Sequence, residues 1–120
     1  MILVAEVVTW FEAPAQSDPA SARQVEVAVD TLADHGPALG RPLVDRIKGS
    51  EWHHMKELRP GSSGRTGIRV LFAFDTVRRA VLLVAGDKAG DWSGWYDANV
   101  PIAEKRYQDH ITELETREYE

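Results

Sequence analysis

The chain has 120 residues, of which 43% are hydrophobic and 28% are charged, and its formal net charge is −5. This length suits one domain spanning residues 1–120, and the hydrophobic fraction is sufficient for a core without a metal or a covalent staple. The absence of cysteine excludes disulfides, a thiolate nucleophile and a cysteine-based zinc site, and it fits the reducing cytoplasm.

The first half of the chain is predicted to form a strand and a helix. Residues 2–11 are rich in Val, Ile, Trp and Phe, which favours a strand. Their apolar opening, residues 2–5, is soon interrupted by Glu6 and is too short for a signal peptide or a membrane span. Pro19 suits the first turn of a helix, and apolar residues then recur every three or four positions as far as Gly36. For residues 39–48 we expect a short helix or an irregular crossing.

The second half is predicted to form three strands, at about 54–59, 68–75 and 80–87, and a final helix from about residue 99. Short, turn-like linkers between the strands favour antiparallel pairing. The acidic end of the chain is expected to fray from about residue 115. Together these elements predict an α+β fold, with a small antiparallel β-sheet, helices packed on one face and the other face open.

The positive charge of the chain is concentrated around these strands. Residues 41–88 hold ten of the 14 Lys and Arg residues and have a net charge of +5, whereas the other residues have a net charge of −10. Because side chains alternate along a strand, Arg59 and Arg69 are expected to meet on the open face, opposite Leu58 and Val70. A pair of arginines can hold a phosphate and neutralise charge that builds on it. The alternative is that each arginine pairs with a neighbouring carboxylate, such as that of Glu57.

Three segments, His54 to Pro60, Ile68 to Asp75 and Leu82 to Trp92, resemble the HigB-like branch of the RelE/ParE toxin superfamily. These are small bacterial toxins encoded beside an antitoxin, and the resemblance implies the same small antiparallel sheet. It also implies a ribosome-dependent mRNA endonuclease, in which a ribose 2′-OH attacks the adjacent phosphate without a metal or other cofactor. The implied partners are mRNA, the ribosome and an antitoxin, expected to be a helix-turn-helix protein from the adjacent gene.

Two other functions fit the same resemblance. One is a ParE-like inhibitor of DNA gyrase that has no chemistry of its own, and the other is an inactive binding protein with a toxin fold. These readings share one fold, so fold alone does not separate them.

Catalytic roles are implied by the resemblance for Arg59, Arg69 and Lys88. The two arginines would stabilise the extra negative charge of the transition state. Lys88 follows the last strand in a glycine-containing stretch, where it would orient the substrate or protonate the leaving oxygen. The alternative for Lys88 is a solvated turn lysine paired with Asp87 or Asp91.

Three further residues are candidates for substrate binding: Lys56, His54 and Trp92. Trp92 lies in a predicted loop, where its ring could stack on an RNA base, whereas Trp95 and Tyr96 are expected to pack under the last helix. His54 titrates near neutral pH, but it has no accompanying cluster of metal ligands.

Overall fold

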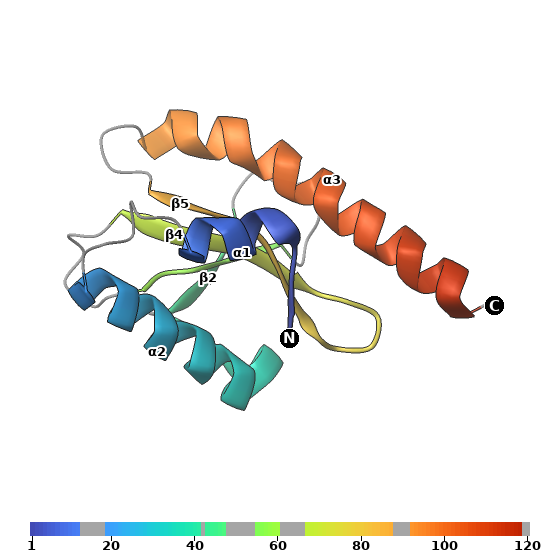
Figure 1. Ribbon diagram of the computed structural model, residues 1–120, viewed down its shortest axis with the longest axis horizontal. Coiled ribbons are helices and arrows are strands. Elements are labelled where there is room, and N and C mark those ends of the chain that lie inside the picture. Colours follow the sequence, from blue (N-terminus) through green and yellow to red (C-terminus); the bar gives the residue numbers. More distant parts are fainter. Residues whose placement is uncertain (13–18, 42, 48–54, 61–66, 88–91, 119–120) are drawn as a thin grey trace.

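The computed structural model describes residues 1–12, 19–41, 43–47, 55–60, 67–87 and 92–118, and for residues 19–22, 92, 117 and 118 it is limited to the backbone (Figure 1). Its elements are, in chain order, β1 (Ile2–Leu3), α1 (Ala5–Glu12), α2 (Pro19–His35), the 3₁₀ helix η2 (Gly36–Ala38), β2 (Val44–Arg46), β3 (Lys56–Leu58), β4 (Ile68–Phe74), β5 (Ala80–Asp87) and α3 (Trp92–Glu118).

The described strands form a five-stranded sheet in the order β1-β5-β4-β3-β2. The three strands predicted in the second half of the chain are β3, β4 and β5, and they pair antiparallel as expected. Strand β2 pairs antiparallel with β3, so residues 44–46 form an edge strand rather than a helix or an irregular crossing. Strand β1 pairs parallel with β5. The predicted α+β class is confirmed, and the sheet is mixed rather than purely antiparallel.

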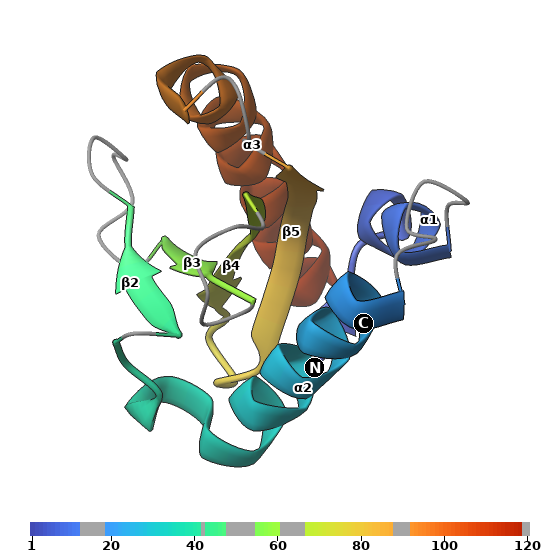
Figure 2. The same cartoon turned by 90° about the vertical axis from the view of Figure 1, so that its left-hand side faces the viewer.

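Helices cover both faces of the sheet, which corrects the expectation that one face is open. On one face, Val70 and Phe72 of β4 belong to a core cluster with Leu32 of α2. On the other face, Leu71 of β4 belongs to a second cluster with Tyr107 of α3. Figure 2 shows α2 and α3 on opposite sides of β5. Alternate residues of β4 are therefore buried on both faces, as in a central strand between two layers of helices.

The first predicted strand is mostly helix. Only Ile2–Leu3 are extended, and α1 follows from Ala5. Val4, Val7 and Phe11 contact the α2-side core, and their spacing of three and four residues is that of one helical face. Packing of this face therefore prevails over the strand propensity of the β-branched residues. Helix α1 lies beside β5, between α2 and α3 (Figure 1).

The final helix begins at Trp92 instead of near Asn99 and ends at Glu118. The expected fraying from about residue 115 stays a prediction. Pro101 lies inside this helix rather than in its first turn. Proline has no N–H to donate to the carbonyl of Asp97, one turn earlier. In the same turn, the side-chain amide of Asn99 donates to the Trp95 carbonyl at 2.8 Å. Within the described residues, α3 and the other helices lack an apolar stretch that could cross a membrane.

Polar contacts in the middle of α3 help to hold this helix on the sheet. Arg106 Nη1 donates to the Leu83 carbonyl at 2.8 Å, the Tyr107 hydroxyl donates to the Phe74 carbonyl at 2.9 Å, and His110 Nε2 lies 3.0 Å from Asp75 Oδ2. Leu83 is the extra residue of a β-bulge, because Leu71 pairs with Val84 and Phe72 pairs with Leu82. Arg106 thus supplies a donor to the carbonyl of the bulged residue.

Candidate functional site

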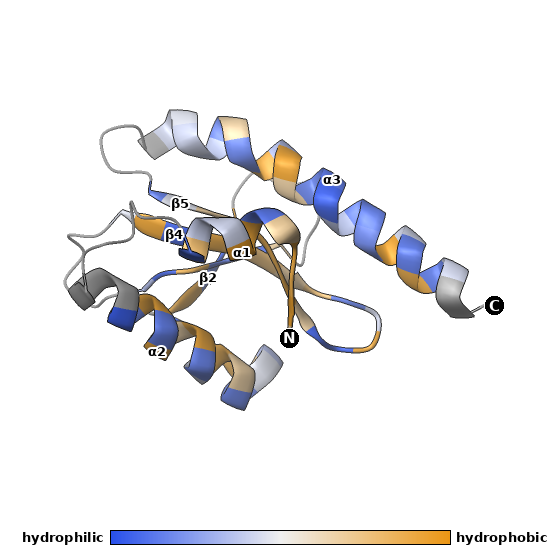
Figure 3. Ribbon diagram, in the orientation of Figure 1, coloured by the Kyte–Doolittle hydropathy of each residue, from blue (hydrophilic) through white to orange (hydrophobic). Residues whose placement is uncertain are grey.

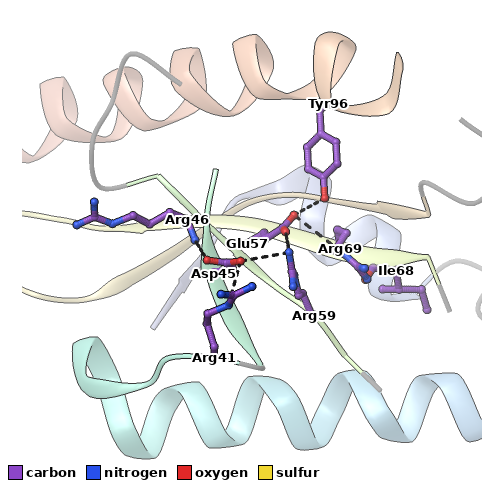
Figure 4. A network of polar contacts seen from close by, with 8 residues as sticks. All are labelled: Arg41, Asp45, Arg46, Glu57, Arg59, Ile68, Arg69 and Tyr96. Atoms are coloured by element: carbon purple, nitrogen blue, oxygen red, sulfur yellow. Dashed lines mark hydrogen bonds and ion pairs between the residues drawn. The ribbon is translucent and has the colours of Figure 1, made fainter. Parts of the chain in front are cut away.

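A network of alternating charges lies on the α3 side of strands β2, β3 and β4. Asp45 pairs in register with Glu57, and Glu57 pairs with Leu71, so these three side chains lie on one face. Arg59 and Arg69 are each two positions from a member of this set and therefore lie on the same face. Figure 4 shows the side chains converging below α3.

Glu57 is the centre of this network, which we call the Glu57 network. The whole Glu57 residue, backbone included, is only 3% exposed. Oε1 accepts a hydrogen bond from Arg59 Nε at 2.9 Å and lies 2.8 Å from Arg59 Nη2. Oε2 accepts a hydrogen bond from the Tyr96 hydroxyl and lies 4.0 Å from Arg69 Nε. Two guanidinium groups and a phenol thus compensate one buried carboxylate, as a buried charge requires.

The network continues from the buried Glu57 to the protein surface. Arg59 Nη2 is also 3.4 Å from Asp45 Oδ2, and the same oxygen is 3.4 Å from Arg41 Nε. The exposed fraction of the side chain is 11% for Arg69, 33% for Arg59 and 77% for Arg41. Of the two arginines that contact Glu57, Arg59 is therefore the one accessible to a ligand from solvent.

Tyr96 brings a phenol from α3 to the network, a contact that the sequence did not predict. Burial, followed by the hydrogen bond to Glu57 and the negative charge of that residue, raises the pKa of Tyr96 to about 12. The hydroxyl is consequently protonated at neutral pH and acts as a donor. The last helix was predicted to begin near residue 99, after Tyr96. A predicted start before Tyr96 would have placed this residue on the helical face that packs on the sheet.

Close packing between α3 and the end of β5 positions Tyr96. A Cβ atom on Gly86 would lie 2.9 Å from Trp95 Nε1, so the indole occupies space that only glycine leaves free. The rings of Trp95 and Tyr96 are in edge-to-face contact, with centroids 5.2 Å apart. Both residues pack against the α3-side core, as expected, although they belong to α3 itself.

Comparisons with known proteins identify the family. Residues 15–108 match the family described as phage derived protein Gp49-like (DUF891). The chain belongs to this family. It is 50% identical over 111 residues to "Putative toxin HigB3" of Mycobacterium tuberculosis, a match that covers 92% of each chain. It is also 50% identical over 91 residues to "Putative toxin HigB2" of the same organism, covering 76% of this chain and 45% of that protein.

The HigB-like resemblance predicted from the sequence is confirmed at the level of this family and these relatives. Membership of the wider RelE/ParE superfamily stays a prediction. No solved structure is significantly similar to the chain.

In this Gp49-like protein, Arg59 and Arg69 lie on one face of the sheet, as side-chain alternation predicted. That face is not open to solvent, however, because α3 covers part of it, and the whole Arg69 residue, backbone included, is 9% exposed. Both arginines contact Glu57, which was the alternative weighed from the sequence. Lys56 lies on the opposite face, where its ammonium group is 5.6 Å from the centre of the Phe74 ring.

Three other candidates cannot be placed relative to the Glu57 network. His54 and Lys88 lie outside the described residues, and Trp92 begins α3 with a side chain that is likewise outside them. Their assigned roles, and that of Lys56, stay predictions.

A second buried carboxylate, Asp75, stabilises the turn between β4 and β5. Its Oδ1 accepts hydrogen bonds from the backbone N–H groups of Val77 and Arg79, and its Oδ2 contacts Arg79 Nε at 3.1 Å and His110 Nε2 at 3.0 Å. Burial alone would raise the pKa of Asp75, but the hydrogen bonds from His110, Arg79 and Val77 prevail and lower it. Asp75 is therefore an anchor for α3 and the turn.

No group of three or more potential metal-ligating side chains (His, Cys, Asp or Glu) occurs in the part of the chain that the structure describes. The arginines of the Glu57 network carry fixed positive charge, which can neutralise an anion in place of a metal.

Proposed function

We propose that this protein is the toxin of a type II toxin–antitoxin system, and that it is a metal-independent endonuclease that cleaves mRNA on the ribosome. The toxin assignment is supported by the two M. tuberculosis relatives. The nuclease assignment is supported by one observation, the convergence of a carboxylate, a protonated phenol and an accessible arginine in the Glu57 network.

The proposed reaction requires three chemical roles. A base removes the proton of a ribose 2′-OH, whose oxygen forms a bond to the adjacent phosphorus. The bond from phosphorus to the 5′-oxygen breaks, and that oxygen takes up a proton from an acid. The products are a 2′,3′-cyclic phosphate and a free 5′-hydroxyl, and the phosphate gains negative charge that a cation must stabilise.

The residues of the Glu57 network fit these roles unequally. Arg59 is the cation that would contact the phosphate, because one third of its side chain is exposed. Glu57 is the candidate base, a role that requires the 2′-OH to displace Arg59 or Tyr96 from it, because the residue is 3% exposed and both of its oxygens accept hydrogen bonds. Arg69 is buried and acts through Glu57, as a positioning residue.

Proton delivery to the leaving oxygen has two candidates. Tyr96 stays protonated at neutral pH, and an alkoxide is basic enough to take its proton. Lys88 is the second candidate, on the basis of the family resemblance. Trp92 is proposed to stack on a base beside the scissile phosphate, on the same basis.

The test uses the purified protein, translating ribosomes and a defined mRNA, with cleavage sites and rates read by primer extension. Arg59→Ala is expected to lower the cleavage rate by about 100-fold or more, the usual effect of removing one group that stabilises transition-state charge. Arg23→Ala, which truncates an exposed arginine of α2, is the matched control and should cleave at the native rate.

The same preparations separate the nuclease from a gyrase inhibitor. If native protein leaves the mRNA intact while relaxed plasmid DNA accumulates in expressing cells, the target is gyrase and the nuclease proposal is wrong. If Arg59→Ala cleaves at the native rate, cleavage does not depend on the Glu57 network.

A further inference from the structure

An apolar groove lies between α1 and α2, in a part of the protein that the proposed reaction does not use. Its volume is about 290 Å³, and its lining consists of Leu3, Trp10, Phe11, Val25, Glu26, Val29 and Asp30. None of these residues belongs to the Glu57 network. The volume is at the lower end of the range of ligand pockets. Because an apolar cavity of about 150 Å³ holds one benzene molecule, this groove can accept roughly two large apolar side chains.

The elements that line the groove also carry exposed apolar residues. Among the large hydrophobic residues that the structure describes as exposed, Met1 precedes β1, Val8 belongs to α1 and Val27 belongs to α2, although none of the three lines the groove. Figure 3 shows apolar residues alternating with polar residues along α2, the pattern of a helix with two different faces. Exposed apolar surface with a polar border is typical of a site that binds another protein.

The border of the groove is negatively charged. Glu26, Asp30 and Asp34 are exposed and follow one another at intervals of four residues, so they form a row along one side of α2. Helix α1 contains no Lys or Arg; its Glu12 is exposed, whereas its Glu6 lies 4.0 Å from Arg106 of α3. Arg23 of α2 lies three residues before Glu26 on the same side of the helix, so this row holds three carboxylates and one cation, and its net negative charge disfavours an RNA backbone. The complementary occupant is a peptide segment with apolar side chains flanked by Lys or Arg.

We propose that the groove between α1 and α2 binds an amphipathic, basic segment of the antitoxin. Two apolar side chains of this segment enter the groove, and its Lys or Arg residues pair with Glu26 and Asp30. The proposal rests on the assignment as a toxin with an antitoxin partner, and it holds whether the cellular target is RNA or gyrase. A second copy of the chain fits less well, because the chain has a net charge of −5 and the helices α1, α2 and α3 each carry exposed carboxylates.

The test reverses the charge of the border without changing the apolar lining. The double variant Glu26→Lys with Asp30→Lys alters two exposed residues of α2, and Glu113→Lys with Glu115→Lys makes the same charge change on exposed residues of α3. The partner is the product of the reading frame adjacent to the toxin gene, and its Kd for each purified variant is measured by calorimetry. Circular dichroism confirms that each variant is folded.

We expect the α2 variant to bind the antitoxin at least about tenfold more weakly, since like charges across an interface oppose association. The α3 variant should bind within about twofold of the native chain. Trp10→Ala, which removes apolar lining instead of charge, should also weaken binding. In cells, the α2 variant should arrest growth despite co-expression of the antitoxin, and without the antitoxin it should be as toxic as the native chain.

Several results would overturn the proposal. If both the α2 charge variant and Trp10→Ala bind the antitoxin with native affinity, the antitoxin binds elsewhere. If the native chain does not bind the product of the adjacent reading frame, that protein is not its partner and the proposal is wrong. A native dimer that the α2 charge variant converts to a monomer, seen by light scattering, would assign the groove to a second copy of the chain. Loss of toxicity in the α2 variant without antitoxin would show that the groove serves the toxic activity itself, whereas a native chain that is harmless alone would contradict the toxin assignment.

Discussion

Replacing Glu57 by Gln should destabilise the protein strongly, although the two side chains have nearly the same size. Glu57→Gln removes the negative charge at the centre of the Glu57 network. The side chain of Glu57 is 4% exposed and that of Arg69 is 11% exposed, so their ion pair is largely shielded from water. Removing the carboxylate leaves the positive charge of Arg69 in a medium of low dielectric constant without this partner.

The size of the effect can be bounded from the burial of each partner. Breaking a buried ion pair by removing one member costs about 3–5 kcal/mol. The lower end of this range applies here, because Arg59 is one third exposed and can turn towards water, and because glutamine still offers an oxygen to its Nε. A loss of about 3 kcal/mol corresponds to a fall in Tm of roughly 10–15 °C for a domain of this size.

The measurement is thermal and urea unfolding of native protein, Glu57→Gln and Glu115→Gln, the last being the same substitution at an exposed position of α3. Glu115→Gln should change the free energy of unfolding by less than about 0.5 kcal/mol. If Glu57→Gln unfolds within about 2 °C of the native protein, the charge of Glu57 does not hold the network together, and its burial between the arginines has been misinterpreted.

Two further substitutions test how α3 is held and what it positions. The folded-state pKa of Asp75 is lowered from 3.8, so its stabilising effect is complete above the unfolded pKa and is lost as the pH falls through the folded value. The difference in unfolding free energy between native protein and Asp75→Asn should therefore be constant near neutral pH and shrink below about pH 4. In urea titrations, a difference that stays constant from about pH 6 to about pH 2 would contradict this. Gly86→Ala would bring a Cβ atom within 2.9 Å of Trp95 Nε1, so the indole must move, and Tyr96 must move with it. We expect a shifted resonance of the indole N–H group and slower mRNA cleavage. Gly40→Ala is the control, because its Cβ atom would have no other atom within 4 Å, and it should change neither the resonance nor the cleavage rate. Unchanged spectra and cleavage in Gly86→Ala would show that this packing does not position Tyr96.

The strands of the site could be predicted because their signal is local. In β4 the residues alternate between two faces, and the same alternation in β3 places Arg59 on the face of Arg69. This rule needs only the sequence of each strand and the pairing of neighbours. It also placed Glu57 on that face, so the contact between this carboxylate and the arginines was available as an alternative from the sequence.

The helices were harder to predict because their limits depend on packing. Residues 5–12 have the composition of a strand, but Val7 and Phe11 become helical by contact with α2 and the sheet. Pro101 resembles the start of a helix, whereas nine residues of α3 precede it. Because the helix was predicted to start near Pro101, Trp95 and Tyr96 were placed outside it. The sequence therefore did not predict that α3 covers this face of the sheet, nor that the Tyr96 phenol reaches Glu57.

The net charge of a segment also overestimates the cationic surface that a substrate meets. Residues 41–88 have a net charge of +5, but Arg41, Arg59 and Arg69 contact the carboxylates of Asp45 and Glu57 in the folded protein. A phosphate that approaches Arg59 therefore meets a negative charge immediately behind the guanidinium, which weakens binding of the ground state.

In the proposed reaction this repulsion decreases as the reaction proceeds. When Glu57 accepts the proton of the 2′-OH, its own charge is neutralised while negative charge builds on the phosphate. The guanidinium of Arg59, which is divided between Glu57 and the substrate at the start, is then available to the phosphate alone. Stabilisation that is greater in the transition state than in the bound substrate raises kcat rather than affinity. Arg59→Ala should accordingly lower kcat far more than it raises KM, and an effect confined to KM would reduce Arg59 to an anchor for the RNA backbone.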